Sequence, residues 1–264
     1  MPNVLHALFV AWQNPLTRRF YPVARLSQIS DDAGQGWFEF AYIRGALNAD
    51  QFTPFVSFPN LEQTYRAQDL FPMFANRLLS EKRADFPTYL AHLGLPSATT
   101  SPLLILSRST GRRVTDTLEL FPLPELEPEH GYRTWFWAHA LRHLSQESHA
   151  RLAALVPEES VFPRCDPQNP VDSDAIELLS DDGTRIGFMP SYLLDDAHTL
   201  QQTCTLCKVF VERINPPPAP LQQRLLLRLE ACWPHGFVPY ATDRYQPISS
   251  EAATLLRPVL PGVD

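Results

Sequence analysis

Residues 164–192, RCDPQNPVDSDAIELLSDDGTRIGFMPSY, carry the strongest fold signal in the chain. Pro167 and Pro170 fix two φ angles near the start of this stretch, and the Asp and Asn side chains around them can close turns with the backbone. Two strand-like runs follow, joined through Asp182-Gly183, a pair that favours the positive φ of hairpin turns. The stretch therefore predicts a rigid polar loop followed by a tight β-hairpin.

The rest of the C-terminal half has the alternating and helical patterns of a small mixed fold. Gly187, inside the second strand of the hairpin, favours a bulge or the close approach of another backbone segment. Ser145 and Ser191 stand at positions expected for helix N-caps. Strands are expected over residues 132–141, 175–179, 185–188, 208–214 and 225–233, and helices over residues 145–155 and 192–202, while residues 161–165 lead into the polar loop.

A longer motif surrounds the hairpin. It begins with D-P-x-N-P-x-D-x-x-A-I, continues through the hairpin, and ends with I-G-F-x-P-S-Y-L at a helix start. This order resembles the HIRAN domain family. The resemblance implies a β-barrel of SH3-like or OB-like kind, with helices, over residues 130–250. It also implies binding of single-stranded DNA, in the best understood members at a free 3′ end.

The resemblance further implies which residues would bind nucleic acid. An Arg-Tyr pair of the family, which contacts phosphate and stacks on a base, corresponds to Arg142 and His143. The loop positions that offer amides to the terminal nucleotide correspond to Gln168 and Asn169. The acid that accepts a hydrogen bond from the 3′ hydroxyl corresponds to Asp172.

Structural interpretations of these residues remain open. The second stacking tyrosine of the family corresponds to Val171, and valine lacks the aromatic face that stabilises each stacked base by roughly 1–3 kcal/mol. Asn169 and Asp172 are of the types that close turns with their own backbone. Arg142 can pair with a surface acid. The aromatic run at residues 135–137 is more typical of core packing than of a stacking platform.

The N-terminal half predicts a separate module over residues 1–125, ending at the proline-rich and acidic run PLPELEPE. A hairpin is expected between residues 23–29 and 37–43. Helical spacing begins at Asn60, with Pro72 starting a new turn or kinking the helix. Shorter elements are expected over residues 86–93 (helix), 103–107 (helix, with Ser101 as N-cap and Pro102 at its first position) and 115–121 (strand).

Within this half, the run Y-x-x-x-x-L-F-P-x-F-x-N-R-L-L at residues 65–79 follows a hairpin that opens with F-Y-P-V-A-R-L. The order resembles the small N-terminal subdomain of HipA, the kinase of bacterial toxin and antitoxin pairs, over roughly residues 18–95. No glycine-rich phosphate loop or kinase catalytic segment follows. The resemblance therefore implies a module that docks onto a protein partner, without kinase activity.

Charge and composition narrow the functional classes. The net charge is −7, and because Arg and Lys balance Asp and Glu in residues 1–125, the excess acid lies in the half with the HIRAN-like motif. A protein that binds nucleic acid through general phosphate attraction would be basic. No apolar run long enough to span a bilayer and no secretion signal is found, which predicts a cytoplasmic protein.

No motif predicts an enzyme or a cofactor. Cys204 and Cys207 form a C-x-x-C pair without a second such pair, so zinc is less favoured than reduced cysteines in the interior. Metalloprotease, nucleophile-elbow and P-loop motifs are not found. Two hypotheses remain. One is a non-enzymatic reader of single-stranded DNA ends with an N-terminal partner-docking module. The other is a protein-interaction or antitoxin-like regulator of a separately encoded HipA-type kinase or other effector.

Overall fold

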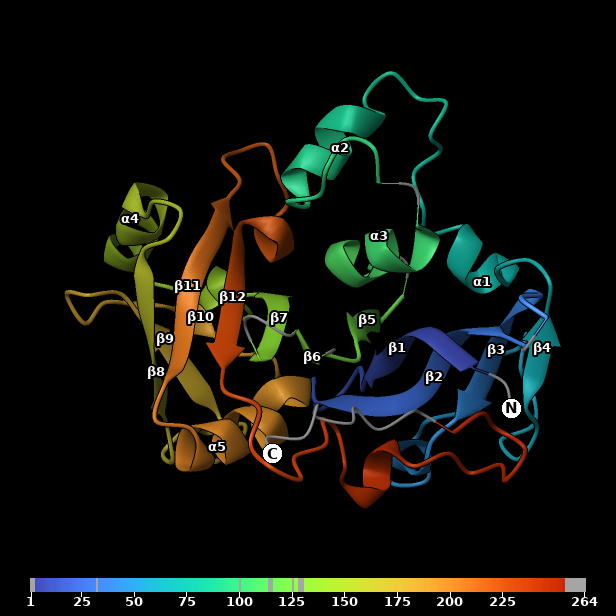
Figure 1. Ribbon diagram of the computed structural model, residues 1–264. Coiled ribbons are helices and arrows are strands. Elements are labelled where there is room, and N and C mark those ends of the chain that lie inside the picture. The colour runs from blue at the N-terminus through green and yellow to red at the C-terminus, as the bar shows by residue number, and fades with distance from the viewer. Residues whose placement is uncertain are drawn as a thin grey trace, which may run out of the picture. The chain divides into compact units, whose positions relative to one another are not determined.

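The computed structural model describes residues 3–31, 33–99, 101–113, 116–124, 126–127 and 131–254 (Figure 1). It has a mixed α+β fold with two antiparallel sheets, each in its own compact unit. Unit 1 consists of Met1–Leu90, Pro96–Leu123 and Val238–Asp264, and unit 2 consists of Ala91–Leu95 and Pro124–Phe237.

Unit 1 is built on a five-stranded sheet in the order β4-β3-β2-β1-β5. The strands are β1 (Asn3–Gln13), β2 (Phe20–Ser30), β3 (Gly36–Tyr42), β4 (Tyr65–Ala67) and β5 (Leu118–Pro122). The expected hairpin forms between β2 and β3. The sequence analysis assigned no element to β1, although β1 pairs with both β2 and β5 and so lies inside the sheet.

Helices and aromatic side chains cover one face of this sheet. They include α1 (Pro72–Ala75) and α3 (Pro102–Ser109), and α2 (Phe86–His92) follows α1. The short 3₁₀ turn η1 (Arg44–Ala46) follows β3, and a second such turn, η5 (Asp243–Tyr245), lies over the opposite face, where Tyr245 packs on Phe9 (Figure 1). Ser101 caps α3 as expected, because its side chain accepts a hydrogen bond from the Leu104 amide. Phe40, Phe58 and Phe74 pack together in the core of the unit.

The prediction of a helix that begins at Asn60 is wrong. Tyr65 instead pairs with Phe40 in the sheet, as part of β4, and α1 is only one turn long. Pro72 stands at the first position of α1, where its missing N–H costs nothing, and a proline disfavours helical geometry in the residue before it. Upstream of Pro72 the chain therefore forms turns and the short strand β4 in place of a helix.

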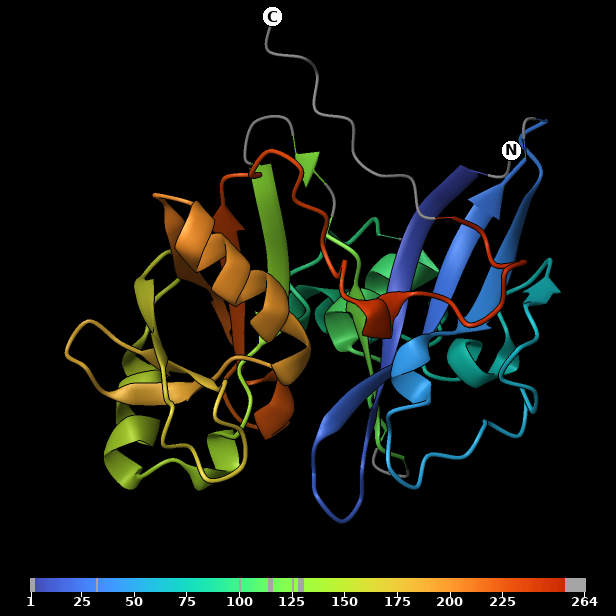
Figure 2. The same ribbon diagram turned by 90° about the horizontal axis from the view of Figure 1, so that it is seen from below.

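The segment from Val238 onward returns to unit 1, whereas the sequence analysis placed residues up to 250 in the second module. Backbone hydrogen bonds attach this segment to the C-terminal end of β3. The Ile248 amide donates to the Tyr42 carbonyl at 3.0 Å, and the Arg44 amide donates to the Gln246 carbonyl at 2.9 Å. Figure 2 shows this segment running over β1, β2 and β3. We call residues 238–254 the strap.

Unit 2 contains a seven-stranded sheet in the order β10-β9-β8-β11-β12-β7-β6. Its strands are β6 (Leu126–Glu127), β7 (Gly131–Trp137), β8 (Ser160–Cys165), β9 (Ile176–Leu179), β10 (Arg185–Phe188), β11 (Cys207–Ile214) and β12 (Leu225–Ala231). His139, just after β7, pairs with Phe188 at the end of β10 through two backbone hydrogen bonds of 2.8 and 3.1 Å. The sheet therefore curls until β10 meets the end of β7, which gives a partly closed barrel.

Gly187 permits this closure. Its φ of +152° is accessible to few residues with a side chain, and a Cβ added there would lie 3.0 Å from the Ala138 Cβ and 3.2 Å from the His139 carbonyl oxygen. The register of β10 against β9 also shifts between Arg185 and Gly187. Both expectations for this glycine, a bulge and a close backbone, are therefore confirmed.

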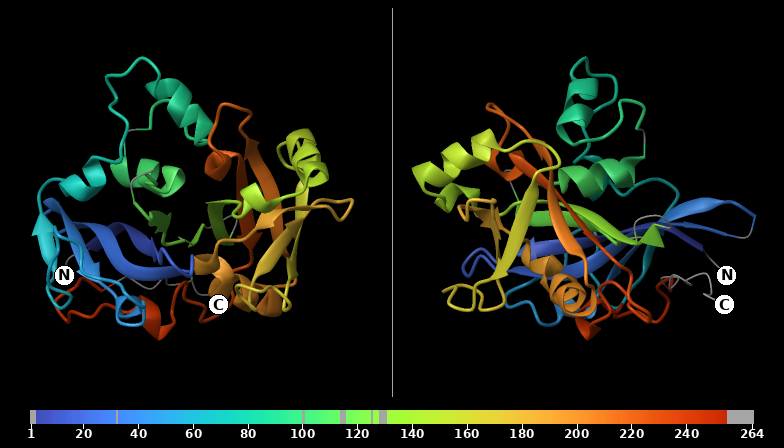
Figure 3. Two further views of the ribbon diagram at one scale, coloured as in Figure 1. Left: turned by 180° about the vertical axis from the view of Figure 1, so that it is seen from behind. Right: turned by 60° about the vertical axis from the view of Figure 1, so that its left-hand side comes forward.

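Two helices lie at opposite ends of β8 and β11 (Figures 1 and 3). One is α4 (Gln146–Ala154), which precedes β8, and the other is α5 (Leu194–Thr203), which precedes β11. Ser145 caps α4 as expected. Ser191 does not cap α5, because the 3₁₀ turn η3 (Ser191–Leu193) comes before the helix and the Ser191 hydroxyl makes no hydrogen bond with any residue that the structure describes.

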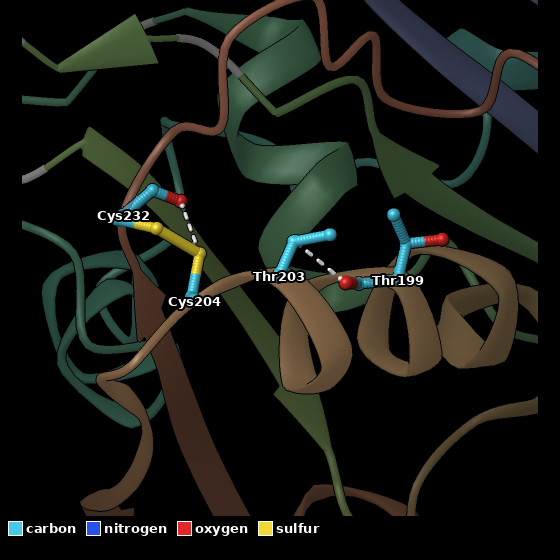
Figure 4. Close-up of a disulfide and its surroundings, with 4 residues drawn as sticks. All are labelled: Thr199, Thr203, Cys204 and Cys232. Carbon is cyan, nitrogen blue, oxygen red and sulfur yellow. Dashed lines mark hydrogen bonds between the residues drawn. A yellow bond between two sulfur atoms is a disulfide. The ribbon is translucent and has the colours of Figure 1, made fainter.

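The cysteines differ from expectation. Cys204, at the end of α5, forms a disulfide with Cys232, just after β12 (Figure 4). The interpretation of Cys204 as a reduced cysteine is therefore wrong, and Cys204 is not available to bind zinc with Cys207. Among the described residues no group of His, Cys, Asp and Glu is arranged to hold a metal ion. No helix in the described part of the chain is long and apolar enough to cross a membrane.

Candidate nucleic-acid interface

The polar loop between β8 and β9 is held by its own backbone. The Asp166 amide donates to the Ala175 carbonyl at 2.8 Å, which closes the loop at its base. The Asn169 amide donates to the Asp166 carbonyl at 3.0 Å, which makes a turn inside it. Pro167 and Pro170 stiffen that turn, since each fixes a φ angle. The loop therefore has a defined shape while most of its residues face solvent.

Asn169 holds this shape with its side chain. Its Oδ1 accepts hydrogen bonds from the amides of Val171, at 3.1 Å, and Asp172, at 3.2 Å. Its Nδ2 donates to Asp166 Oδ2 at 3.2 Å. The turn-closing interpretation of Asn169 thus matches the geometry, and the amide oxygen has little capacity left for a ligand.

Asp172 and Gln168 retain groups that can bind a ligand. Asp172 Oδ1 accepts from the Asp174 amide at 3.1 Å, but its Oδ2 makes no hydrogen bond within the described residues. Gln168 is exposed, and its side-chain amide likewise has no partner in the described part of the chain. Asp172 and Gln168 therefore offer a carboxylate oxygen and an amide that make no hydrogen bond with another described residue.

Arg142 and His143 lie on η2 (Leu141–His143), the 3₁₀ turn that follows β7. Both are exposed, and Arg142 Nε donates to His143 Nε2 at 2.8 Å. Because a guanidinium can only donate, His143 must accept through Nε2 and carry its proton on Nδ1. The pair presents a cationic plane beside a neutral imidazole, which are the groups that contact phosphate and stack on bases.

Arg142 differs from the other exposed arginines of unit 2. Arg164 pairs with Glu177 at 2.7 Å, and Arg185 lies 3.7 Å from the same carboxylate. Arg142 makes no ion pair with a described residue, so the interpretation in which it pairs with a surface acid is not what the structure shows. Its positive charge is available to an anionic ligand.

Within the described residues, no hydrogen bond or ion pair joins η2 to the 166–174 loop. Each of the two groups is placed by a different part of the barrel. The side chain of Leu141 lies beside Gly187 of β10, which fixes η2, whereas the loop connects β8 to β9. The five residues expected to bind nucleic acid therefore form two groups. Arg142 and His143 form one, and Gln168, Asn169 and Asp172 form the other.

The sequence analysis did not single out His198, which also positions the loop. His198 lies on α5, and its Nε2 is 3.0 Å from the Asp174 carbonyl oxygen. Asp174 and His198 are 24 residues apart in the sequence, and they meet only because the fold places α5 beside the loop. A local sequence pattern cannot predict such a contact. Of the aromatic run at residues 135–137, Phe136 and Trp137 are buried, as core packing predicts.

Comparison with known proteins finds only limited similarity. No protein-family model and no curated protein matches the chain. The HIRAN domain of human HLTF matches in structure with a TM-score of 0.29 and 16% identity, over 38% of this chain and 74% of that domain. A protein from Lactobacillus plantarum matches with a TM-score of 0.27 and 18% identity, over 37% of this chain and 98% of that one. TM-scores of this size do not establish a common fold. None of these findings supports the resemblance to HipA, which stays a prediction.

Proposed function

We propose that unit 2 is a non-enzymatic module that binds single-stranded nucleic acid, and that the free 3′ end of DNA is its preferred ligand. The observation that carries the proposal is the exposed guanidinium of Arg142, which pairs with no carboxylate among the described residues although acids are abundant in this half of the chain. An unpaired cation on an acidic module favours a ligand that supplies the anion.

Each residue has a separate role in the proposal. Arg142 binds a phosphate and His143 stacks on a base. Asp172 Oδ2 accepts a hydrogen bond from the 3′ hydroxyl, and the amide of Gln168 binds the terminal nucleotide. Asn169 holds the loop in shape and does not itself contact the ligand.

A comparison of oligonucleotides that end in a 3′ hydroxyl or a 3′ phosphate tests the role assigned to Asp172. A carboxylate accepts a hydrogen bond from a hydroxyl but repels a phosphate, so the two ends of one oligonucleotide should bind differently. Fluorescence anisotropy with a single-stranded oligonucleotide labelled at its 5′ end measures the affinity. We expect binding with a free 3′ hydroxyl and a loss of at least about tenfold with a 3′ phosphate, which corresponds to about 1.4 kcal/mol. Equal affinity for the two oligonucleotides, or no binding of either, would reject end recognition.

Arg142→Gln has a matched control in Arg164→Gln. Both arginines are exposed on unit 2, but Arg164 is already paired with Glu177. Removal of a charged group that binds phosphate costs roughly 1.5–3 kcal/mol. Arg142→Gln should therefore weaken binding about tenfold or more, and Arg164→Gln should leave it nearly unchanged. An equal effect of the two substitutions would show that general charge, and not the Arg142 site, determines affinity.

The second candidate function is protein interaction, in which unit 2 binds no nucleic acid. The specific observation in its favour is Val171, which is 60% exposed in the centre of the loop where an aromatic side chain would be needed for stacking. Under this alternative the N-terminal unit docks onto a separately encoded HipA-type kinase or other effector. Failure of every oligonucleotide to bind, with the fold intact, is the outcome that favours it.

A further inference from the structure

A thiol and an imidazole lie together at the base of the 166–174 loop. Cys165 is the last residue of β8, is exposed, and is not part of the disulfide. Its Sγ is 3.9 Å from Nδ1 of His198, which lies on α5. Neither residue belongs to the nucleic-acid site proposed above, although the loop begins directly after Cys165.

The Asp174 carbonyl determines which nitrogen of His198 carries the proton. Its oxygen lies 3.0 Å from His198 Nε2 and can only accept a hydrogen bond, so Nε2 must donate. In the neutral ring Nδ1 is then the basic nitrogen, and it faces Cys165 Sγ. A nucleophile, a base within reach and a third group that orients the base are the arrangement of an activated nucleophile.

We propose that Cys165 is a nucleophilic thiol for which His198 is the general base, and that hydroperoxides are the reagents that modify it. The Cys165 thiol gives its proton to His198 Nδ1, and the thiolate sulfur attacks one oxygen of the hydroperoxide. An S–O bond forms as the O–O bond breaks. The departing alkoxide or hydroxide takes the proton from the imidazolium, so the products are the Cys165 sulfenic acid and an alcohol or water.

The chain contains its own comparison thiol. Cys207 is also free, but it is partly buried, and burial raises the pKa of its thiol. Cys204 and Cys232 are joined and do not compete. An unassisted thiol with a pKa of about 8.5 is only about 3% ionised at pH 7, so a base that fully activates Cys165 can increase its rate by up to about 30-fold.

The test exposes the full chain to hydrogen peroxide at pH 7 with a dimedone-type trap for sulfenic acid, and peptide mass spectrometry measures labelling at each cysteine. We expect Cys165 to be labelled at least about tenfold faster than Cys207. Labelling of Cys165 no faster than Cys207 would overturn the proposal.

His198→Gln separates a base from a structural support. The glutamine amide nitrogen can occupy the place of Nε2 and keep the hydrogen bond to the Asp174 carbonyl, but glutamine cannot take a proton at the place of Nδ1. We expect the variant to lose at least about tenfold in the rate of Cys165 labelling, while labelling of Cys207 is unchanged. An unchanged rate at Cys165 would show that His198 only holds the loop. A parallel loss at Cys207 would show a general change of the fold, and either result contradicts the proposal.

Discussion

Asp172 combines two roles in one carboxylate, and they can be separated. Its Oδ1 accepts from the Asp174 amide, while Oδ2 is free for a ligand. Asp172→Asn keeps an oxygen acceptor for the turn but removes the negative charge. We expect an unchanged free energy of unfolding, and a preference for the 3′ hydroxyl over the 3′ phosphate that falls by at least about tenfold, since the charge no longer repels phosphate.

Denaturant unfolding and anisotropy together measure the two effects of this substitution. Asn169→Ala is the opposite control, because Asn169 makes three hydrogen bonds inside the loop and is expected to act mainly on stability. If Asp172→Asn destabilised the protein as much as Asn169→Ala did, Asp172 would be a structural residue.

Tyr42 gives unit 1 a dependence of stability on alkaline pH. Its hydroxyl donates to the Phe58 carbonyl at 2.8 Å and accepts from the Phe55 amide at 2.7 Å. Burial raises the pKa of the Tyr42 hydroxyl to about 12, so the folded state favours the protonated form. This contribution is fully present below about pH 10, the ordinary pKa of tyrosine, and is lost as the pH rises toward 12.

Urea unfolding at pH 9 and pH 11 measures this effect in the wild-type chain and in Tyr42→Phe. The variant loses a buried hydroxyl and should be less stable at pH 9 by about 1–3 kcal/mol. It should also lose less stability than the wild type between the two pH values. The same pH dependence in both proteins would show that other groups cause it.

At the scale of elements, the strap is held by charged side chains that are themselves buried. Arg25 is 2% exposed and Glu39 is 1% exposed, and they lie 3.7 Å apart on β2 and β3. Glu39 Oε1 accepts from the Ala253 amide at 2.8 Å, and Arg25 donates to the Ala253 carbonyl. Arg66 of β4 also pairs with Glu39, at 3.0 Å. The pair therefore binds the backbone of a single strap residue.

Glu39→Ala should destabilise unit 1 strongly, because it leaves Arg25 buried without its carboxylate. Breaking a buried ion pair from one side costs about 3–5 kcal/mol. Asp85→Ala is the matched control, since the pair of Asp85 with Arg83 is exposed and such pairs are worth about 0–1 kcal/mol. Urea unfolding measures both changes, and similar small losses would show that the strap does not depend on Glu39.

The sequence predicted the elements that local chemistry determines. The caps at Ser101 and Ser145, and the turn and bulge at Gly183 and Gly187, depend on residues within a few positions of each other. Local pattern did not identify β1, the strap or the disulfide, because each depends on partners distant in sequence. In the candidate site it named the residues of both groups, but it could not show that the side chain of Asn169 is used in hydrogen bonds within the loop or that His198 lies beside the loop.

At the scale of the whole molecule, the net charge of −7 limits how the protein can bind nucleic acid. Each phosphate neutralised on a single strand contributes about −0.7 to the slope of log affinity against log salt concentration. With Arg142 as the main phosphate contact, we expect a slope of about −1. Anisotropy titrations at several salt concentrations measure it. A slope of about −4 or steeper would require a basic surface and would contradict a site of few contacts.

The most direct measurement is nuclear magnetic resonance of the isotope-labelled full chain, titrated with a short single-stranded DNA that has a free 3′ hydroxyl. The account predicts that chemical shifts change at Arg142, His143, Gln168 and Asp172, and that a 3′ phosphate removes the changes at Gln168 and Asp172. No shift changes, or changes confined to unit 1, would contradict it.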